Sequence, residues 1–142
     1  MQRRVLITGA QGFVGRYLAA DLLHTHGEHL AVLGIGRSQR RDETFTHNVT
    51  WGGSVIAAPL PPEIVNWTSD HRFDYALADL REPQPFTAMI ERFRPTHVFH
   101  LASGLRDDPL GKLLESNVLA TTTLLNALAG QGELQHIVLG LK

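Results

Sequence analysis

Short apolar runs and longer stretches with helical spacing alternate along most of the chain. Five apolar runs are short and rich in β-branched or aromatic residues, which predicts buried strands: 5–8, 30–35, 73–78, 96–102 and 136–139. In three other stretches apolar residues recur every three or four positions, which predicts amphipathic helices: 14–22, 86–93 and 110–128. Strands that alternate with helices are typical of an α/β fold, so we expect a doubly wound parallel sheet of about five strands.

The helical spacing also predicts buried faces. In the first helix this face consists of Val14, Leu18 and Leu22. In the last helix the predicted face is longer and consists of Leu110, Leu113, Leu114, Val118, Thr121, Leu124, Leu125 and Leu128. The stretch 42–71 has no sustained period. We expect a short edge strand at 55–58, a helical turn at 62–66, and an excursion that packs on the domain.

Composition narrows the class of protein. The 142 residues are 43% hydrophobic, enough for one domain over 1–142 with a real core. A formal charge of −1 gives no electrostatic reason to expect nucleic acid or an anionic membrane as partner. The absence of cysteine excludes disulfides and thiolate catalysis. No apolar run approaches the ~18 residues of a membrane span, and we expect a cytoplasmic protein.

Three histidines lie together just after the first predicted helix: His24, His26 and His29. Because Gly27 is a typical helix stop and cations favour the carboxyl end of a helix, we interpret them as exposed end residues. A metal site would need all three to converge, and we expect none.

The first predicted strand runs into three glycines, Gly9, Gly12 and Gly15, and a helix follows. A helix N-terminus offers unpaired N–H groups and partial positive charge, and glycines let a phosphate approach the backbone. The spacing is one residue longer than the Gly-x-Gly-x-x-Gly fingerprint of dinucleotide-binding folds. The stretch therefore favours a dinucleotide-binding βα unit, and a purely structural βα turn is the alternative.

The second predicted strand ends in Gly36, Arg37 and Ser38, with no acid before Asp42. In a dinucleotide fold this position meets the adenosine ribose, where an acid favours NAD and an arginine accommodates the 2′-phosphate of NADP. Guanidinium–phosphate contacts are strong and can be bidentate. We expect NADP in preference to NAD, and a solvated basic loop is the alternative.

Four predicted strands end at a glycine, an acid or another small residue: Gly9, Gly36, Asp79 and Ala102. The carboxyl ends of parallel strands meet at one edge of a sheet, where ligands bind at the topological switch point. The glycine turn, the basic residues, the acid and the small residues therefore belong to one site. This convergence predicts a Rossmann-like domain that binds a nicotinamide dinucleotide.

Four motifs in order carry a resemblance to a known family: Thr8–Gly15 (Thr-Gly-Ala-Gln-Gly-Phe-Val-Gly), Ala78–Leu80, His100–Ser103 and Ser116–Ala127. The chain resembles the extended short-chain dehydrogenase/reductases, the NAD(P)-dependent epimerase/dehydratase group that acts largely on nucleotide sugars. The resemblance implies that the first motif contacts the pyrophosphate, the second the adenine and the third the central part of the cofactor. The fourth motif would anchor the cofactor-side loop. The implied residues are Gly9, Gly12, Phe13, Val14, Gly15, Asp79, Leu80, Leu101, Ala102, Ser103 and Asn117.

The pattern of the last helix supports Asn117 independently. It lies between Leu114 and Thr121 on the predicted apolar face, where a buried amide is costly unless it is hydrogen-bonded. A structural asparagine with a satisfied amide is the alternative. His100 lies at a strand end, and we interpret it as a core or loop-packing residue.

The chain departs from the family in its catalytic residues. Family chemistry uses a Ser or Thr together with Tyr-x-x-x-Lys, in which the tyrosine is the acid/base. Here the tyrosines are Tyr17 and Tyr75 and the lysines Lys112 and Lys142, so this pair is absent and we name no catalytic residue. We expect a cofactor-binding part without the substrate-binding part.

Three hypotheses follow: an enzyme fragment that needs a full-length form to act on a nucleotide sugar, a non-catalytic NAD(P)-binding sensor module, or a Rossmann-like interaction domain without cofactor. In each case we expect uncovered apolar surface, which favours self-association.

Overall fold

The computed structural model describes residues 1–37, 39, 45–59, 61–104 and 107–140. Five strands form one sheet in the order β5-β2-β1-β6-β7. Their bounds are β1 Arg3–Thr8, β2 Leu30–Gly36, β5 Phe73–Leu77, β6 His97–His100 and β7 His136–Leu139. Every pairing in this sheet is parallel. The predicted doubly wound parallel sheet of five strands is confirmed, and its order reverses between β1 and β6.

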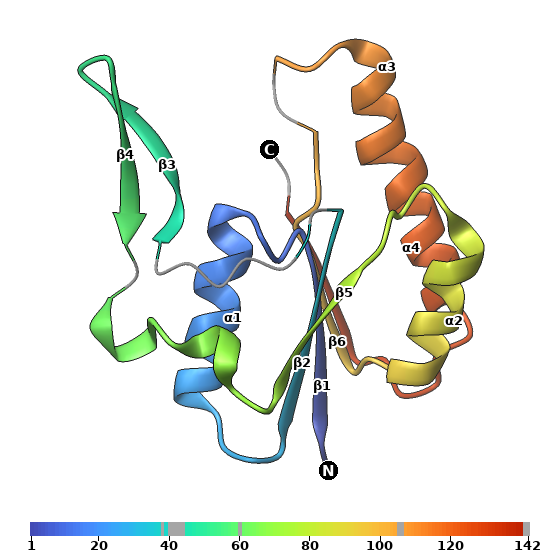
Figure 1. Cartoon of the computed structure of the whole chain (residues 1–142). Helices are drawn as coiled ribbons and strands as arrows, with labels where there is room; N and C mark the ends of the chain where they lie inside the picture. The colour runs from blue at the N-terminus through green and yellow to red at the C-terminus, as the bar shows by residue number, and fades with distance from the viewer. Residues whose placement is uncertain (38, 40–44, 60, 105–106, 141–142) are drawn as a thin grey trace.

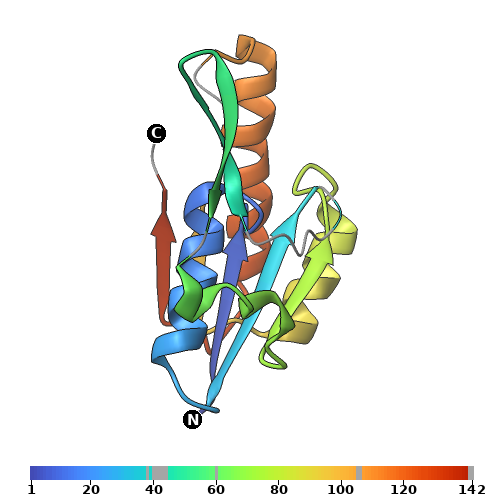
Figure 2. The same cartoon turned by 60° about the vertical axis from the view of Figure 1, so that its left-hand side comes forward.

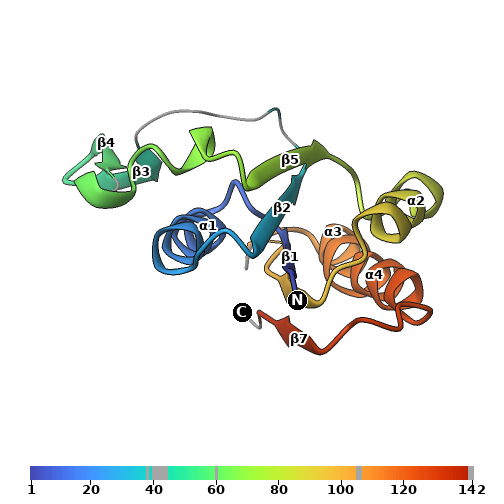
Figure 3. The same ribbon diagram turned by 90° about the horizontal axis from the view of Figure 1, so that it is seen from below.

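Helices cover both faces of the sheet (Figure 3). Helix α1 (Phe13–Thr25) lies on one face, and α2 (Pro83–Phe93) and α4 (Ala120–Leu128) lie on the other. Strand β1 supplies both cores, because Val5 and Ile7 belong to the cluster under α1 and Leu6 belongs to the cluster under α2 and α4. A central strand that is buried on both faces reads as a continuous apolar run, which is why residues 5–8 were recognisable as a strand.

The predicted buried face of α1 is partly wrong. Val14 is 55% exposed, and Leu18 and Leu22 are only partly buried against the core. The buried face is instead made of small residues with one leucine and one arginine: Gly15, Arg16, Ala19, Ala20 and Leu23. Small residues let the helix axis approach the sheet closely, which an apolar stripe of larger residues would prevent.

Glycines fix how the turn after β1 meets α1. Gly9 has a φ of +70°, a left-handed conformation that glycine adopts without strain. A Cβ on Gly9 would lie 2.8 Å from the amide nitrogen of Ala102. A Cβ on Gly15 would lie 2.4 Å from the carbonyl oxygen of Gly9 and 2.8 Å from the Cα of Ala10. Backbone meets backbone on both sides of this turn, so the turn leaves no room for side chains there.

The last helix changes its winding along its length. It runs from α3 (Leu110–Leu113) through the π-helical segment η3 (Leu114–Leu119) into α4. The amide of Ala120 donates to the carbonyl of Glu115, the i→i−5 bond of a π-helix. The extra residue rotates everything before it by about 100° relative to α4.

The predicted apolar face of this helix is therefore correct only in part of α4, where Leu125 is 42% exposed. Leu124 and Leu128 are buried, whereas Leu110 is 72% exposed and Leu114 and Val118 are also exposed. Besides the change of winding, α3 and η3 rise beyond the end of the sheet (Figure 1), so the sheet does not lie beneath them.

The stretch between β2 and β5 forms a separate β-hairpin (Figure 2). Strands β3 (Phe45–Trp51) and β4 (Ser54–Pro59) pair with each other in antiparallel fashion and form their own sheet. The predicted strand at 55–58 therefore exists, but it is not an edge strand of the main sheet. Gly52 and Gly53, with φ of +56° and +79°, make the turn.

Two short 3-10 helices, η1 (Pro62–Ile64) and η2 (Trp67–Ser69), return the chain from the hairpin to the sheet. The helical turn predicted near 62 is confirmed by η1. The buried Trp67 ring packs edge-on against Phe73 at a centroid distance of 4.7 Å. The excursion thus packs on the domain at η2, while Trp51 at the hairpin end is 78% exposed.

Apolar side chains are also exposed on β7, the edge strand of the main sheet. Ile137, Val138 and Leu139 are each more than one-third exposed. Self-association through such surface stays a prediction. Within the described residues, no helix has the length and apolar character needed to cross a lipid bilayer.

A largely buried ion pair ties the carboxyl end of α1 to the start of β5. Arg72 donates to the carbonyls of Leu23 and His26, both at 2.6 Å, and its Nη2 lies 2.6 Å from a carboxylate oxygen of Asp70. Hydrogen bonds from Arg72 lower the pKa of Asp70 from 3.8 to about 2. Because the folded state binds this proton more weakly, the pair stabilises the fold above pH 3.8 and loses that effect as the pH falls towards 2.

We predict that Asp70→Asn lowers the free energy of unfolding by about 2 kcal/mol at pH 7, the equivalent of the pKa difference. Urea unfolding measured from pH 7 to pH 2 checks this, because the two proteins should converge at the acid end. Asp21→Asn on the exposed side of α1 is the control and should change stability by less than about 0.5 kcal/mol. Parallel curves for Asp70→Asn and the wild type would contradict the assignment.

We predict that Gly15→Ala destabilises the domain by about 2 kcal/mol, because its Cβ would meet backbone atoms that cannot move independently. Thermal unfolding followed by circular dichroism measures the effect. The matched control is Gly27→Ala, since a Cβ at Gly27 would meet nothing within 4 Å. Equal melting temperatures for the two variants would show that the turn tolerates a side chain.

Candidate functional site

The N-terminus of α1 lies at the carboxyl end of β1 and carries no side-chain cap. Gly12 is the N-cap residue, and the first turn contains no acidic residue. Helix geometry leaves the N–H groups of Val14 and Gly15 without an acceptor inside the helix. Together with the helix dipole, they make the start of α1 a positively polarised surface. Phe13 and Val14 beside it are 51% and 55% exposed, whereas Gly15 is buried.

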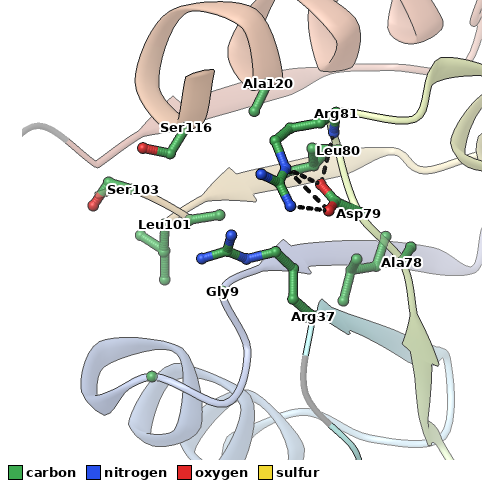
Figure 4. Close-up of a pocket in the computed structure, with 14 residues that line it drawn as sticks. Gly9, Arg37, Ala78, Asp79, Leu80, Arg81, Leu101, Ser103, Ser116 and Ala120 are labelled. Atoms are coloured by element: carbon green, nitrogen blue, oxygen red, sulfur yellow. Dashed lines mark hydrogen bonds and ion pairs between the residues drawn. The ribbon is translucent and has the colours of Figure 1, made fainter. Parts of the chain in front are cut away.

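A cavity of about 300 Å³ adjoins this turn, at the edge where the strands end (Figure 4). Four strand ends meet there, and the last helix closes it from above. Eight predicted site residues line the cavity: Gly9, Gly12, Arg37, Asp79, Leu80, Leu101, Ala102 and Ser103. The predicted convergence of strand ends at one site is therefore what the fold produces.

Five predicted residues do not line this cavity. Phe13, Val14 and Gly15 lie in the first turn of α1, just behind Gly12. Asn117 borders a neighbouring cavity. Ser38 lies outside the described residues.

Two arginines and one carboxylate dominate the electrostatics of the cavity. Asp79 accepts hydrogen bonds from Arg81, at 3.0 Å from Nε and 2.6 Å from Nη2. These bonds hold the pKa of Asp79 below its usual value, and the positive charge of Arg37 adds to the effect. Asp79 is consequently an anion with its oxygens already engaged. Among the described residues, none forms a hydrogen bond or ion pair with the Arg37 guanidinium, which points into the cavity (Figure 4).

Sequence reasoning missed Arg81, Ser116 and Ala120, which also line the cavity. Arg81 directly follows the Asp79–Leu80 pair and reaches across to Glu115 of η3 at 3.3 Å. Its place directly after the predicted Asp79–Leu80 pair was an available signal. Ser116 and Ala120 had no such signal, because the π-helical winding that sets their direction is not visible in the apolar pattern.

The loop after β6 joins this cavity to a second one of about 190 Å³, which is lined in part by Ser103, Asn117 and Thr121. Ser103 lines both cavities, and its Oγ is buried without a hydrogen-bond partner among the described residues. A buried hydroxyl without a partner is costly, so Ser103 is suited to a ligand group.

Asn117 is exposed, which corrects its predicted burial on an apolar face, because that face does not continue into the π-helical segment. The amide has nevertheless found a partner. Its Oδ1 accepts from the backbone N–H of Gly104 at 2.8 Å. This bond ties the loop after β6 to the last helix.

Among the described residues, no three His, Asp or Glu side chains lie close enough together to hold a metal ion. The chemistry of the edge comes from arginines, one carboxylate, hydroxyls and the polarised helix start.

Solved structures show the same fold. The Bordetella bronchiseptica enzyme WbmG in complex with NAD superposes with a TM-score of 0.70 at 20% identity, over 98% of this chain and 37% of its own. UDP-glucuronic acid 4-epimerase from Bacillus cereus in complex with NAD gives 0.63 at 22% identity, over 96% and 39%. Uronate dehydrogenase from Agrobacterium tumefaciens gives 0.66 at 19% identity, over 98% and 40%. The chain thus spans about two-fifths of the length of these proteins.

A search of curated protein sequences found no match. The sequence does match a protein family over residues 5–139, which takes in β1 through β7 and the whole cavity edge. On this match the chain belongs to the NAD dependent epimerase/dehydratase family.

Proposed function

We propose that this chain binds a nicotinamide dinucleotide in the cavity at the carboxyl edge of the sheet. The observation that carries the proposal is the uncapped start of α1, which faces a cavity built from four strand ends. The pyrophosphate lies on the backbone of Gly9 and Gly12, beside the N–H groups of Val14 and Gly15 in the helical turn that Phe13 begins. Close backbone packing at Gly9 and Gly15 keeps side chains out of its path.

The remaining cavity residues divide along the cofactor. Asp79 and Leu80 meet the adenine, and Arg37 with Ser38 meets the adenosine ribose. Leu101, Ala102 and Ser103 contact the central part, where the unpartnered Ser103 Oγ gains a hydrogen bond. Asn117 holds the loop that carries these residues. The NAD complexes of WbmG and of the Bacillus cereus epimerase support a nicotinamide dinucleotide as the ligand class.

We further propose that the site prefers NADP. Strand β2 ends at Gly36, and the next side chain is the Arg37 guanidinium in place of a carboxylate. Asp79 does not replace the carboxylate that is missing at the end of β2, because the oxygens of Asp79 already accept hydrogen bonds from Arg81. The Arg37 guanidinium can therefore donate to a 2′-phosphate without breaking an existing ion pair with a described residue.

In a longer protein with a substrate-binding part, the proposed reaction is hydride transfer at a carbon of a nucleotide-linked sugar, in which the nicotinamide supplies the redox chemistry. This chain contributes the binding and orientation of the cofactor. Tyr17 and Tyr75 do not line the cavity. Tyr17 packs on Phe13 at a ring distance of 5.2 Å, and Tyr75 lies on β5.

A second candidate function is a non-catalytic NAD(P)-binding sensor module, for which the cavity at the sheet edge would suffice. Cofactor-dependent stabilisation together with an effect on a partner protein would distinguish it. Calorimetric titration with NADP and NAD tests both candidates, and the absence of heat with either ligand would leave an interaction domain without cofactor.

We predict that Arg37→Ala weakens NADP binding by about tenfold or more and leaves NAD binding within about twofold, because only the contact to the 2′-phosphate is lost. Isothermal titration at low and high salt measures both affinities. Arg92→Ala, an exposed arginine of α2 away from the cavity, is the matched control. Unchanged NADP affinity in Arg37→Ala would refute the ribose-phosphate role while leaving dinucleotide binding intact.

We predict that the purified chain shows no turnover of nucleotide sugars, because the chain contains no Tyr-x-x-x-Lys pair. Absorbance of the reduced nicotinamide and chromatography of products, with a panel of nucleotide sugars and either cofactor, provide the measurement. A full-length epimerase of the family assayed in parallel controls for the conditions. Clear epimerisation or reduction by the chain alone would contradict the prediction.

A further inference from the structure

His100 forms a buried junction between two strands and a helix. It is 4% exposed, at the end of β6. One ring nitrogen, Nδ1, lies 2.7 Å from the hydroxyl of Thr8 at the end of β1. The other, Nε2, lies 2.8 Å from the hydroxyl of Thr121 in α4. The imidazole thus bridges hydroxyls that are far apart in the sequence and come from opposite sides of the ring.

The hydrogen bonds of Thr8 determine which nitrogen carries the proton. The Thr8 oxygen accepts from the backbone amides of Leu101 and Ala102, both at 3.2 Å. A hydroxyl oxygen has two lone pairs and one proton. Because both lone pairs are used, the hydroxyl can only donate to His100. Nδ1 is therefore an acceptor without a proton, and the proton of the neutral ring lies on Nε2 and is donated to Thr121.

A second proton on the ring would disrupt this arrangement. Protonated Nδ1 would present an N–H to an oxygen that already accepts two N–H groups, and the Thr8 hydroxyl proton would lose its acceptor. The protonated ring would then compete with the Ala102 amide for the Thr8 hydroxyl, whereas the Leu101 amide, which also donates to the Thr8 carbonyl at 3.2 Å, would keep that second bond. Only the neutral ring satisfies every group at the junction.

The junction lies directly behind the proposed cofactor cavity. Thr8 precedes Gly9, and a Cβ on Gly9 would lie 2.8 Å from the amide nitrogen of Ala102. Gly9 forms one wall of the cavity, and Leu101 and Ala102 form the wall that adjoins it. The hydrogen bonds through Thr8 and His100 join these two walls, in addition to the backbone pairing of β1 with β6 and the bond from the Leu101 amide to the Thr8 carbonyl.

Among the described residues, no titratable side chain faces the ring to stabilise a positive charge. Thr8 faces it from β1, Thr121 from α4 and Leu139 from β7, and none of these side chains is titratable. Burial lowers the pKa of His100 accordingly. The ring is therefore neutral at physiological pH and gains a proton only on acidification below the ordinary range of histidine.

We propose that His100 is a positioning residue whose neutral, Nε2-protonated ring holds the two walls of the cavity together, so that protonation of this one ring loosens the walls and weakens cofactor binding. The binding part of this inference rests on the proposed function. The tautomer and the coupling to the Thr8 junction do not, and they can be measured in the free protein.

The first experiment uses the free chain labelled with ¹⁵N. Ring nitrogen shifts of His100 are measured from pH 8 to pH 4.5, together with the exchange of the Leu101 and Ala102 amide protons. We expect the Nε2–H tautomer at pH 8 and amide exchange that accelerates as the ring is protonated. A ring with its proton on Nδ1, or amide exchange that does not follow the titration of His100, would overturn the proposal whether or not the chain binds a cofactor.

The second experiment measures NAD affinity by calorimetry over the same pH range. NAD is used because the 2′-phosphate of NADP itself titrates near pH about 6. His100→Asn keeps an acceptor towards Thr8 and cannot be protonated, so it should bind NAD at pH 8 within about threefold of the wild type and show little loss on acidification. His100→Leu has no acceptor and should bind about tenfold more weakly at pH 8.

Control variants separate this junction from other groups. His97→Asn removes the ring that stacks on His136 at the other end of β6, and it should retain the full pH dependence of NAD affinity. Thr121→Val removes only the Nε2 partner. It should leave the free chain folded by circular dichroism and raise the amide exchange of Ala102 less than His100→Leu does.

Each pattern of results has a distinct meaning. A His100→Asn protein that keeps the wild-type pH dependence, or a folded His100→Leu protein that binds NAD as tightly as the wild type, would overturn the positioning role. If no variant and no wild-type sample binds NAD or NADP, the proposed function fails, and the NMR titration still decides whether His100 controls the junction.

Discussion

The site depends on the contact between two stretches of backbone, the turn after β1 and the loop after β6. Gly9 approaches the amide of Ala102 closely enough that no Cβ fits between them, and Gly15 approaches Gly9 from the helix side in the same way. Thr8 and His100 join the two stretches by buried hydrogen bonds. This one contact orients α1, and it also defines both walls of the cavity. The fold and the candidate site therefore share the same constraint.

The charges at the cavity depend on that arrangement in turn. Parallel strands bring the residues after β2 and β5 to one edge, so Arg37 and Asp79 come together although they are far apart in the sequence. Arg81 then occupies the Asp79 carboxylate and reaches Glu115 in η3. The carboxylate is balanced by its own neighbour, and the guanidinium of Arg37 remains directed at the cavity. The edge consequently offers positive charge at the helix start and at the end of β2.

The strands and the converging strand ends could be predicted because buried parallel strands leave continuous apolar runs and end in glycines or polar residues, as at 5–8 and at Asp79. The buried face of α1 could not be predicted from the sequence. Close packing requires small residues there, such as Gly15 and Ala19, whereas the apolar pattern is carried by larger residues. The π-helical turn at 114–119 adds a residue without any mark in the apolar spacing, so the buried face before Ala120 was misassigned. Strand β3 was missed because Phe45–Trp51 has no sustained alternation, although Gly52 and Gly53 are a hairpin signal.

The glycines alone do not decide between a binding site and a structural turn. Gly9 and Gly15 are required by backbone contacts that would persist in a domain that had lost its ligand. Other features have no such structural reason. The Ser103 hydroxyl is buried without a partner among the described residues, and the Arg37 guanidinium lies at the cavity without an ion pair to any of them. Both are costly or idle in a purely structural domain and are satisfied by a polar, anionic ligand. These two side chains, more than the glycine spacing, are the physical argument that the edge is a binding site.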